Sequence, residues 1–135
     1  MSKSLIDVAV GVILDGHNVL LSKRPAHLHQ GDKWEFPGGK IETGESQSQA
    51  IVRELNEELG ITVTAQQNWF SLTFDYPEKT VRLNMSVVFA FTGEPHGREG
   101  QPVEWVPINS LHTLVFPDAN QPIIEKLQSG DHPTL

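Results

Sequence analysis

The sequence predicts a domain of mixed α and β structure, of the α/β or α+β class, on the basis of three observations. Segments rich in β-branched and aromatic residues are separated by turn-forming residues along most of the chain. Residues 46–60 have the spacing of an amphipathic helix, and a second helical pattern lies near the C-terminal end. The length of 135 residues fits one domain, residues 1–135, with an ordinary hydrophobic core.

The first third of the chain is expected to be mostly β structure. The opening residues are rich in Val and Ile, and an Asp-Gly-His-Asn sequence between two apolar runs is typical of a hairpin turn. We expect strands over residues 5–14, 19–22 and 34–36, a turn at 15–18, a polar loop at 25–33 and a glycine loop at 37–40.

The predicted central helix has clear start and stop signals. Ser46 has N-cap chemistry, and Gly60 follows the last periodic residue as a C-terminal stop. Apolar residues recur at intervals of four and should form one stripe that faces the core. These residues are Ile51, Leu55 and Leu59, with Val52 beside them.

Acidic residues crowd around this helix. Residues 39–61 contain five glutamates, and Glu54, Glu57 and Glu58 stand at i, i+3 and i+4 on a face next to the apolar stripe. Like charges at that spacing destabilise a helix by about 0.2–0.5 kcal/mol per pair, so a positive partner is expected among them. Arg53, one turn before Glu57, can supply part of this positive charge. Carboxylates beside a glycine loop also suit Mg²⁺, although such a face can simply be solvated.

The remainder alternates between strands, turns and short helices. Glu99 lies in a Gly- and Pro-rich loop, where an exposed acid is ordinary, and Asn120 stands where it could cap the last helix. We expect strands at 62–75, 81–91 and 103–106, a turn at 76–79, a loop at 93–102, a short helix at 108–114 and a final helix at 121–128.

Composition narrows the functional classes. A net charge of -7 argues against binding to a nucleic-acid polymer, yet a divalent metal could bridge this acidic chain to a small polyphosphate. The absence of cysteine excludes disulfides and thiolate metal sites, and His27 and His29 lack an evident third ligand. No stretch is long enough to cross a membrane, so we expect a cytoplasmic protein with no membrane partner.

Residues 39–61 fit the Nudix box, G-x5-E-x7-R-E-U-x-E-E-x-G-U with U aliphatic, at every specified position. The matching residues are Gly39, Glu45, Arg53, Glu54, Leu55, Glu57, Glu58, Gly60 and Ile61. The chain therefore resembles Nudix hydrolases. The segments WEFPGGKIETGE, GEPHGREGQPVEW and FPDANQPIIEKL are similar to those of the bacterial MutT group in particular. The resemblance implies a Nudix fold, with a mixed β-sheet between helices and a loop-helix-loop motif, and a monomer.

The same resemblance implies a set of metal-binding and catalytic residues. It assigns Mg²⁺, or Mn²⁺ in its place, to the carbonyl of Gly38 and the carboxylates of Glu54, Glu57, Glu58 and Glu99. Arg53, supported by Glu45, would orient the glutamates. Glu54 and Glu99 are the candidates for accepting a proton from water. The full set of residues assigned a catalytic role is Glu54, Glu57, Glu99 and Arg53.

Recognition of the substrate is also assigned by resemblance. Asn120 would read the purine edge, since its amide both donates and accepts hydrogen bonds. The other assigned substrate-binding residues are Arg24, His29, Phe36, Glu78 and Lys79. Glu78 and Lys79 stand where the resembled proteins more often carry Asp and Arg, a change in reach that affects selectivity.

The implied function is hydrolysis of a nucleoside triphosphate substrate. The resemblance points to conversion of 8-oxo-dGTP to 8-oxo-dGMP and pyrophosphate, and so to nucleotide-pool sanitation and mutation avoidance. Two alternatives stay open. One is a Nudix pyrophosphohydrolase with a preference for CTP or dATP, or a broad preference. The other is a catalytically silent nucleotide-binding Nudix domain, which the complete motif disfavours.

Overall fold

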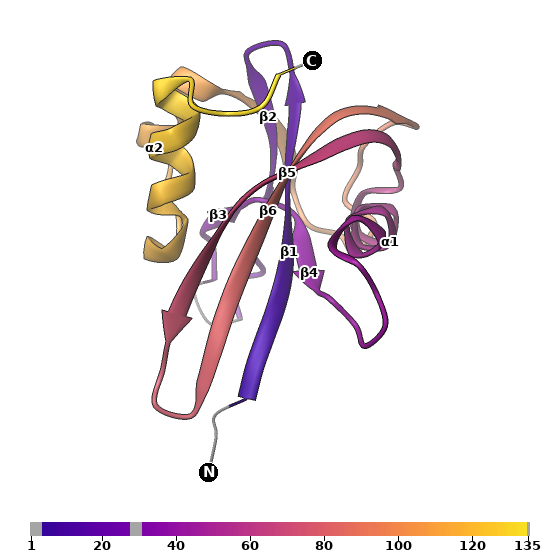
Figure 1. Ribbon diagram of the computed structural model, residues 1–135. Helices are drawn as coiled ribbons and strands as arrows, with labels where there is room; N and C mark the ends of the chain where they lie inside the picture. Colours follow the sequence, from indigo (N-terminus) through magenta and orange to yellow (C-terminus); the bar gives the residue numbers. More distant parts are fainter. Residues whose placement is uncertain (1–3, 28–30, 135) are drawn as a thin grey trace.

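The computed structural model describes residues 4–27 and 31–134, which form a seven-stranded mixed sheet flanked by two α-helices (Figure 1). The strands are β1 (Ser4–Asp15), β2 (Asn18–Lys23), β3 (Trp34–Glu35), β4 (Gly38–Lys40), β5 (Thr62–Asp75), β6 (Lys79–Thr92) and β7 (Val103–Pro107). The helices are α1 (Gln47–Leu59) and α2 (Gln121–Ser129), and the 3-10 turns are η1 (Ile108–Thr113) and η2 (Asp118–Asn120).

Strand β1 organises the sheet. It runs parallel to β6, with pairs from Ser4 and Lys79 to Ile13 and Val88, and β6 pairs antiparallel with β5. On its other edge, β1 pairs antiparallel with β4 and, through the hairpin, with β2, which also pairs with β3 and β7. This confirms the predicted mixed sheet, and it places the glycine segment of β4 beside Ala9 and Val10 in the middle of β1.

Helix α1 covers one face of the sheet because its apolar stripe meets alternate residues of β1. Ala9 and Ile13 on β1 are fully buried against this helix. The helix contributes the buried residues Ala50, Ile51, Leu55 and Leu59. The prediction was wrong for Val52, which is 39% exposed; Ala50 occupies the interior position instead.

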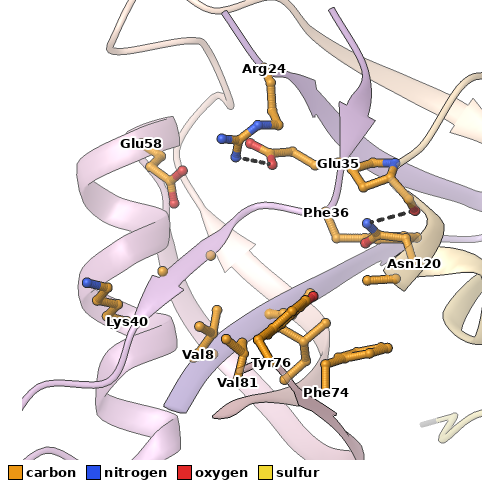
Figure 2. A pocket seen from close by; sticks show the side chains of 17 residues that line it. Val8, Arg24, Glu35, Phe36, Lys40, Glu58, Phe74, Tyr76, Val81 and Asn120 are labelled. Carbon is orange, nitrogen blue, oxygen red and sulfur yellow. Dashed lines mark hydrogen bonds and ion pairs between the residues drawn. The ribbon is translucent and has the colours of Figure 1, made fainter. Parts of the chain in front are cut away.

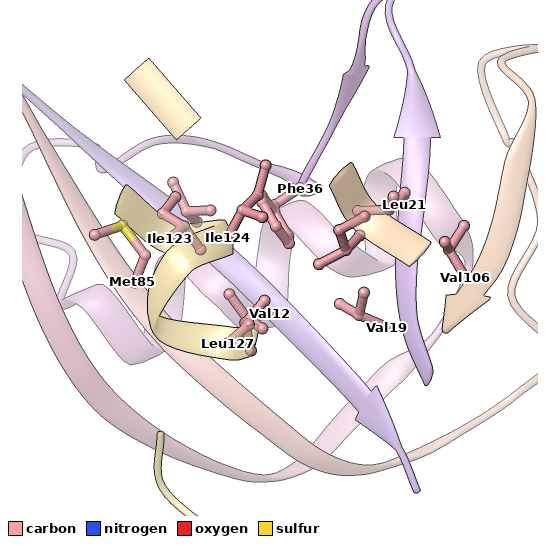
Figure 3. Packing of buried hydrophobic residues seen from close by; sticks show 11 residues of the cluster. Val12, Val19, Leu21, Phe36, Met85, Val106, Ile123, Ile124 and Leu127 are labelled. Carbon is pink, nitrogen blue, oxygen red and sulfur yellow. The ribbon is translucent and has the colours of Figure 1, made fainter. Parts of the chain in front are cut away.

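Helix α2 covers the opposite face (Figures 1 and 3). Val10 and Val12, the intervening residues of β1, pack on this side because side chains alternate across a strand. The cluster is completed by Val19, Leu21, Phe36, Met85, Val106, Leu111, Ile123, Ile124 and Leu127. The sheet therefore lies between helices, as predicted.

The helix signals read from the sequence are confirmed. Ser46 caps α1 by accepting a hydrogen bond from the backbone amide of Gln49, whose side chain in turn accepts from the Ser46 amide. Gly60 ends the helix with φ of 70°, in the left-handed region. The short helix expected over 108–114 is the 3-10 turn η1. Within the described residues, no helix is long and apolar enough to cross a membrane.

Residues Gly38–Lys40 form β4, where a loop was expected. Glycine disfavours strands in general, which hid this strand from the sequence. The reason for its presence is steric: a Cβ atom at Gly38 would collide with the carbonyl oxygen of Ala9. Only a residue without a side chain allows β4 to lie this close to β1.

Candidate active site

A cavity of about 550 Å³ opens between β4, β1, the β5–β6 hairpin and the turn before α2 (Figure 2). Its volume is within the range of about 300–1,000 Å³ typical of small-molecule sites. The lining residues are Val8, Ala9, Val10, Arg24, Glu35, Phe36, Gly38, Gly39, Lys40, Glu58, Phe74, Tyr76, Val81, Leu83, Pro117, Ala119 and Asn120. Figure 2 shows Glu58 and Asn120 on opposite sides of this space.

Arg53 is the positive partner expected among the acids. Its Nε donates to Glu45 Oε2 at 2.8 Å, and its second terminal nitrogen donates to Glu45 Oε1 at 2.9 Å. Its first terminal nitrogen donates to Glu54 Oε1 at 2.8 Å and more weakly to Glu57 Oε2 at 3.5 Å. A further bond of 2.9 Å to the carbonyl of Lys40 ties α1 to the end of β4. Glu45 and Glu54, rather than Glu57, are thus its main partners.

These contacts favour the charged forms of Glu45 and Arg53. The Arg53 hydrogen bonds, with a backbone hydrogen bond at Glu42, lower the pKa of Glu45 to about 2. In turn, Glu45 and then Glu54 raise the pKa of the Arg53 guanidinium. Arg53 therefore keeps its charge and holds Glu54 in one orientation.

Glu54 also packs closely against β4. A Cβ atom at Gly39 would collide with the Glu54 carboxyl group, so the glycine is required for this approach. The Glu54 side chain is only 16% exposed, whereas that of Glu57 is 57% exposed. The two acids, one turn apart, have different surroundings.

Glu58 is the acid of α1 that reaches the cavity (Figure 2). Its Oε2 is buried and has no hydrogen-bond partner among the residues that the structure describes. Burial is the main cause that raises the pKa of Glu58 to about 8, followed by the charges of Glu54, Glu99 and Glu35; a hydrogen bond with the backbone of Gly38 opposes the shift. A buried carboxylate oxygen without a partner is a group that a cation would satisfy.

Glu99 is exposed and lies in the loop that follows β6. Its charge contributes to the raised pKa of Glu58. The loop reaches this position by hydrogen bonds from the amides of His96 and Arg98 to the last carbonyls of α1.

The donors suit a hard divalent cation, although they do not form a closed cage. In residues 4–27 and 31–134, no three His, Asp or Glu side chains gather as a group that could hold a metal ion. Mg²⁺ usually binds through one or two carboxylates together with waters and substrate phosphates, and the buried Glu58 oxygen beside Gly38 offers a starting point. The metal-ligand roles assigned to Gly38, Glu54, Glu57, Glu58 and Glu99 stay predictions.

The opposite side of the cavity gathers several of the predicted substrate-binding residues. Asn120 lines it, and within the described part of the chain its side chain makes no hydrogen bond that caps α2. Its Nδ2 instead donates to the carbonyl of Pro117 at 3.4 Å. Phe36 lines the same space and stacks on Phe116 with a centroid distance of 5.7 Å. Arg24 also lines the cavity, between Glu58 and Asn120 in Figure 2, and donates to Glu35 Oε2 at 3.1 Å.

Not every predicted residue lies at the cavity. Glu78, in the β5–β6 turn, and Lys79, the first residue of β6, are exposed and do not line it in the described structure, whereas Tyr76 from the same hairpin does. His29 lies outside the described residues.

Glu35 is a cavity residue that sequence reasoning missed. Burial raises its pKa, opposed by the Arg24 hydrogen bond. The sequence feature that could have indicated this role is the position of Glu35 as a single acid between two aromatic residues, Trp34 and Phe36.

Comparison with known proteins identifies the family. The NUDIX domain family matches residues 9–126, and the chain therefore belongs to the Nudix hydrolase family. Members of this family generally depend on a divalent metal.

Individual relatives are similar over most of the chain. An 8-oxo-dGTP diphosphatase of Escherichia coli K12 is 43% identical over 124 residues, covering 91% of this chain and 96% of the relative. A CTP pyrophosphohydrolase of the same organism is 37% identical over 122 residues, covering 90% of each. A solved structure from work on MutT of Aliivibrio salmonicida and Vibrio cholerae has a TM-score of 0.83 at 45% identity, covering 94% of this chain and 99% of that one.

Proposed function

We propose that this protein is an 8-oxo-dGTP diphosphatase that uses Mg²⁺ to convert 8-oxo-dGTP to 8-oxo-dGMP and pyrophosphate. The observation that carries the proposal is the cavity itself, with the amide of Asn120 on one side and the buried carboxylate of Glu58 on the other. A nucleotide fits between them with its base at Asn120 and its phosphates at the acidic side. The 43% identical relative named 8-oxo-dGTP diphosphatase supports the same substrate.

At the acidic side, the protein contributes positioned carboxylates and forms no covalent bond with the substrate. Phosphoryl transfer depends on neutralising charge and on placing water in line with the leaving group. When bound, Mg²⁺ supplies that neutralisation and lowers the pKa of water; the carbonyl of Gly38 and the carboxylates of Glu54, Glu57, Glu58 and Glu99 would hold it. Arg53 keeps Glu54 in place, and Glu54 or Glu99 takes the proton of the attacking water.

At the base side, Asn120 gives selectivity through its donor and acceptor atoms. Phe36 supplies an aromatic wall, already supported by Phe116. Arg24 and Glu35 form a polar pair at the same cavity, which offers further hydrogen-bonding groups to a polar base edge.

The test is a comparison of kcat/KM for 8-oxo-dGTP, dGTP, CTP and dATP with Mg²⁺ present, with products identified by phosphorus NMR. We expect 8-oxo-dGTP to have the highest kcat/KM and pyrophosphate to be the product. Equal turnover of 8-oxo-dGTP and dGTP would contradict the proposed substrate.

The second candidate is a CTP pyrophosphohydrolase, because a relative with that name is 37% identical over 90% of the chain. The same measurement separates the two, since CTP would then have the highest kcat/KM. The Glu58 side of the cavity would be used in the same way for either nucleotide.

A further inference from the structure

The loop between β6 and β7 is seated on the C-terminal end of α1. The last carbonyls of a helix have no hydrogen-bond partner within the helix. In this protein the loop provides N–H donors to several of them. The amide of His96 donates to the carbonyl of Leu59 at 3.1 Å, and the amide of Arg98 donates to the carbonyl of Glu58 at 3.0 Å. The Arg98 side chain donates to the carbonyl of Asn56 at 3.1 Å.

Gln101 makes a different kind of contact, because its side chain joins two acidic residues. Its Nε2 donates to the carbonyl of Glu58 at 2.9 Å, and its Oε1 accepts from the amide of Glu99 at 2.9 Å. Both halves of the amide group are used, and only one orientation satisfies a carbonyl and an N–H together. The next residue, Pro102, accepts a hydrogen bond of 3.1 Å from the amide of Lys23 in β2, which anchors Gln101 to the sheet.

The surrounding loop encloses Gln101. A Cβ atom at Gly97 would collide with the Gln101 carbonyl oxygen and meet its Oε1 at 3.0 Å. The amide of Gly100 closes the turn on the carbonyl of Gly97 at 3.0 Å. Gln101 is therefore held by the turn around it, and its bridge is short and fixed.

We propose that Gln101 is a positioning residue that sets the separation of Glu58 and Glu99, so that both carboxylates can serve one divalent cation. This rests on the proposed function for the roles of the two acids. The backbone amide of Arg98 also meets the carbonyl of Glu58, but of these three loop residues Gln101 is the one whose side chain contacts the backbone of both acids.

The experiment compares wild type with Gln101→Met, which keeps the length of the side chain and removes both hydrogen bonds. The matched control is Arg98→Met, which removes a contact between the same loop and the same helix end without touching Glu99. Binding of Mn²⁺ alone is measured by EPR titration, amide exchange of Glu99 by NMR, and kcat and KM with Mg²⁺ in parallel. Gln101→Asn, with the amide one methylene shorter, serves if Gln101→Met does not fold.

We expect Gln101→Met or Gln101→Asn to weaken Mn²⁺ binding by about tenfold or more, the usual effect of losing an outer residue that orients ligands. Amide exchange at Glu99 should quicken, and kcat should fall more than KM rises. Arg98→Met should bind Mn²⁺ nearly as wild type does. Equal Mn²⁺ affinity of the Gln101 and Arg98 variants, or no binding of Mn²⁺ by wild type, would overturn the inference. If wild type hydrolyses no nucleotide while Gln101→Met still weakens Mn²⁺ binding, the proposed function fails and the positioning role stands.

Discussion

The two sides of the cavity are built in different ways. The acidic side depends on one helix, α1, whose acids are held by the several hydrogen bonds of Arg53 and by the loop on its C-terminal end. The Asn120 side is assembled from separate segments: Phe36 after β3, the β5–β6 hairpin and the turn before α2.

This difference indicates where function is fixed and where it can vary. Groups that share one rigid network cannot move independently, which fits the proposal that the acidic side serves one kind of phosphate chemistry. Side chains from separate segments can change one at a time. Relatives named for 8-oxo-dGTP and for CTP both match this chain over 90% or more of its length, which fits a common acidic side with a variable base side.

The largest expected effect comes from the acidic side. Glu54→Gln keeps the shape of the side chain and removes its charge, so we expect kcat to fall by at least about 10²-fold with little change in melting temperature. Glu42→Gln is the matched control, because Glu42 also lies near Arg53, at 3.7 Å, but is exposed. Turnover with Mg²⁺ checks both variants. Unchanged turnover in Glu54→Gln would show that the acidic side does not work through this carboxylate.

A smaller and more selective effect is expected on the base side. Asn120→Ala leaves polar atoms of the base without a partner, at a cost of about 1–3 kcal/mol. The ratio of kcat/KM for 8-oxo-dGTP over dGTP should therefore fall by roughly 10- to 100-fold, with less change for dGTP itself. The neighbouring Gln121→Ala, at an exposed position outside the cavity lining, should keep the wild-type ratio. If Asn120→Ala also kept it, the base would be read elsewhere.

The smallest effect concerns the stability of the metal-free protein. The pKa of Glu58 is raised from 4.5 to about 8, chiefly by burial and then by the charges of Glu54, Glu99 and Glu35. Between these two values the folded protein keeps a proton at Glu58 that the unfolded chain has released, so the free energy of unfolding decreases as pH rises through that window. The Glu58→Gln variant has no ionisable group at this position, so its free energy of unfolding lacks this contribution to the pH dependence.

The measurement is the melting temperature in EDTA across this pH range. The difference between wild type and Glu58→Gln isolates Glu58, because other titrating groups are common to both. We expect wild type to lose stability relative to the variant as pH rises, and Mg²⁺ to restore part of it near the upper limit. Parallel curves for the two proteins would contradict the raised pKa of Glu58.

Much of the fold was predictable because its signals are local. Ser46 and Gly60 delimit α1 by cap chemistry within a few residues of sequence, and the intervals of Ile51, Leu55 and Leu59 predict the buried face. Val52 was mispredicted because it has an apolar side chain that the core does not use. Strand β4 was mispredicted because two of its three residues are glycines, which have no side chain to show a strand pattern.

The sequence by itself determined that acids gather on α1 beside a guanidinium, since helix periodicity alone puts them on one side. It did not distinguish Glu58, whose oxygen is buried and faces the cavity, from Glu57, which is exposed. Nor did it show that Glu35 lines the cavity, or that the Asn120 side chain lines the same cavity as Phe36 and, in the described part of the chain, makes no hydrogen bond that caps α2. Only the tertiary structure decided these points, because burial and desolvation depend on segments that are far apart in the chain and meet only when the sheet has formed.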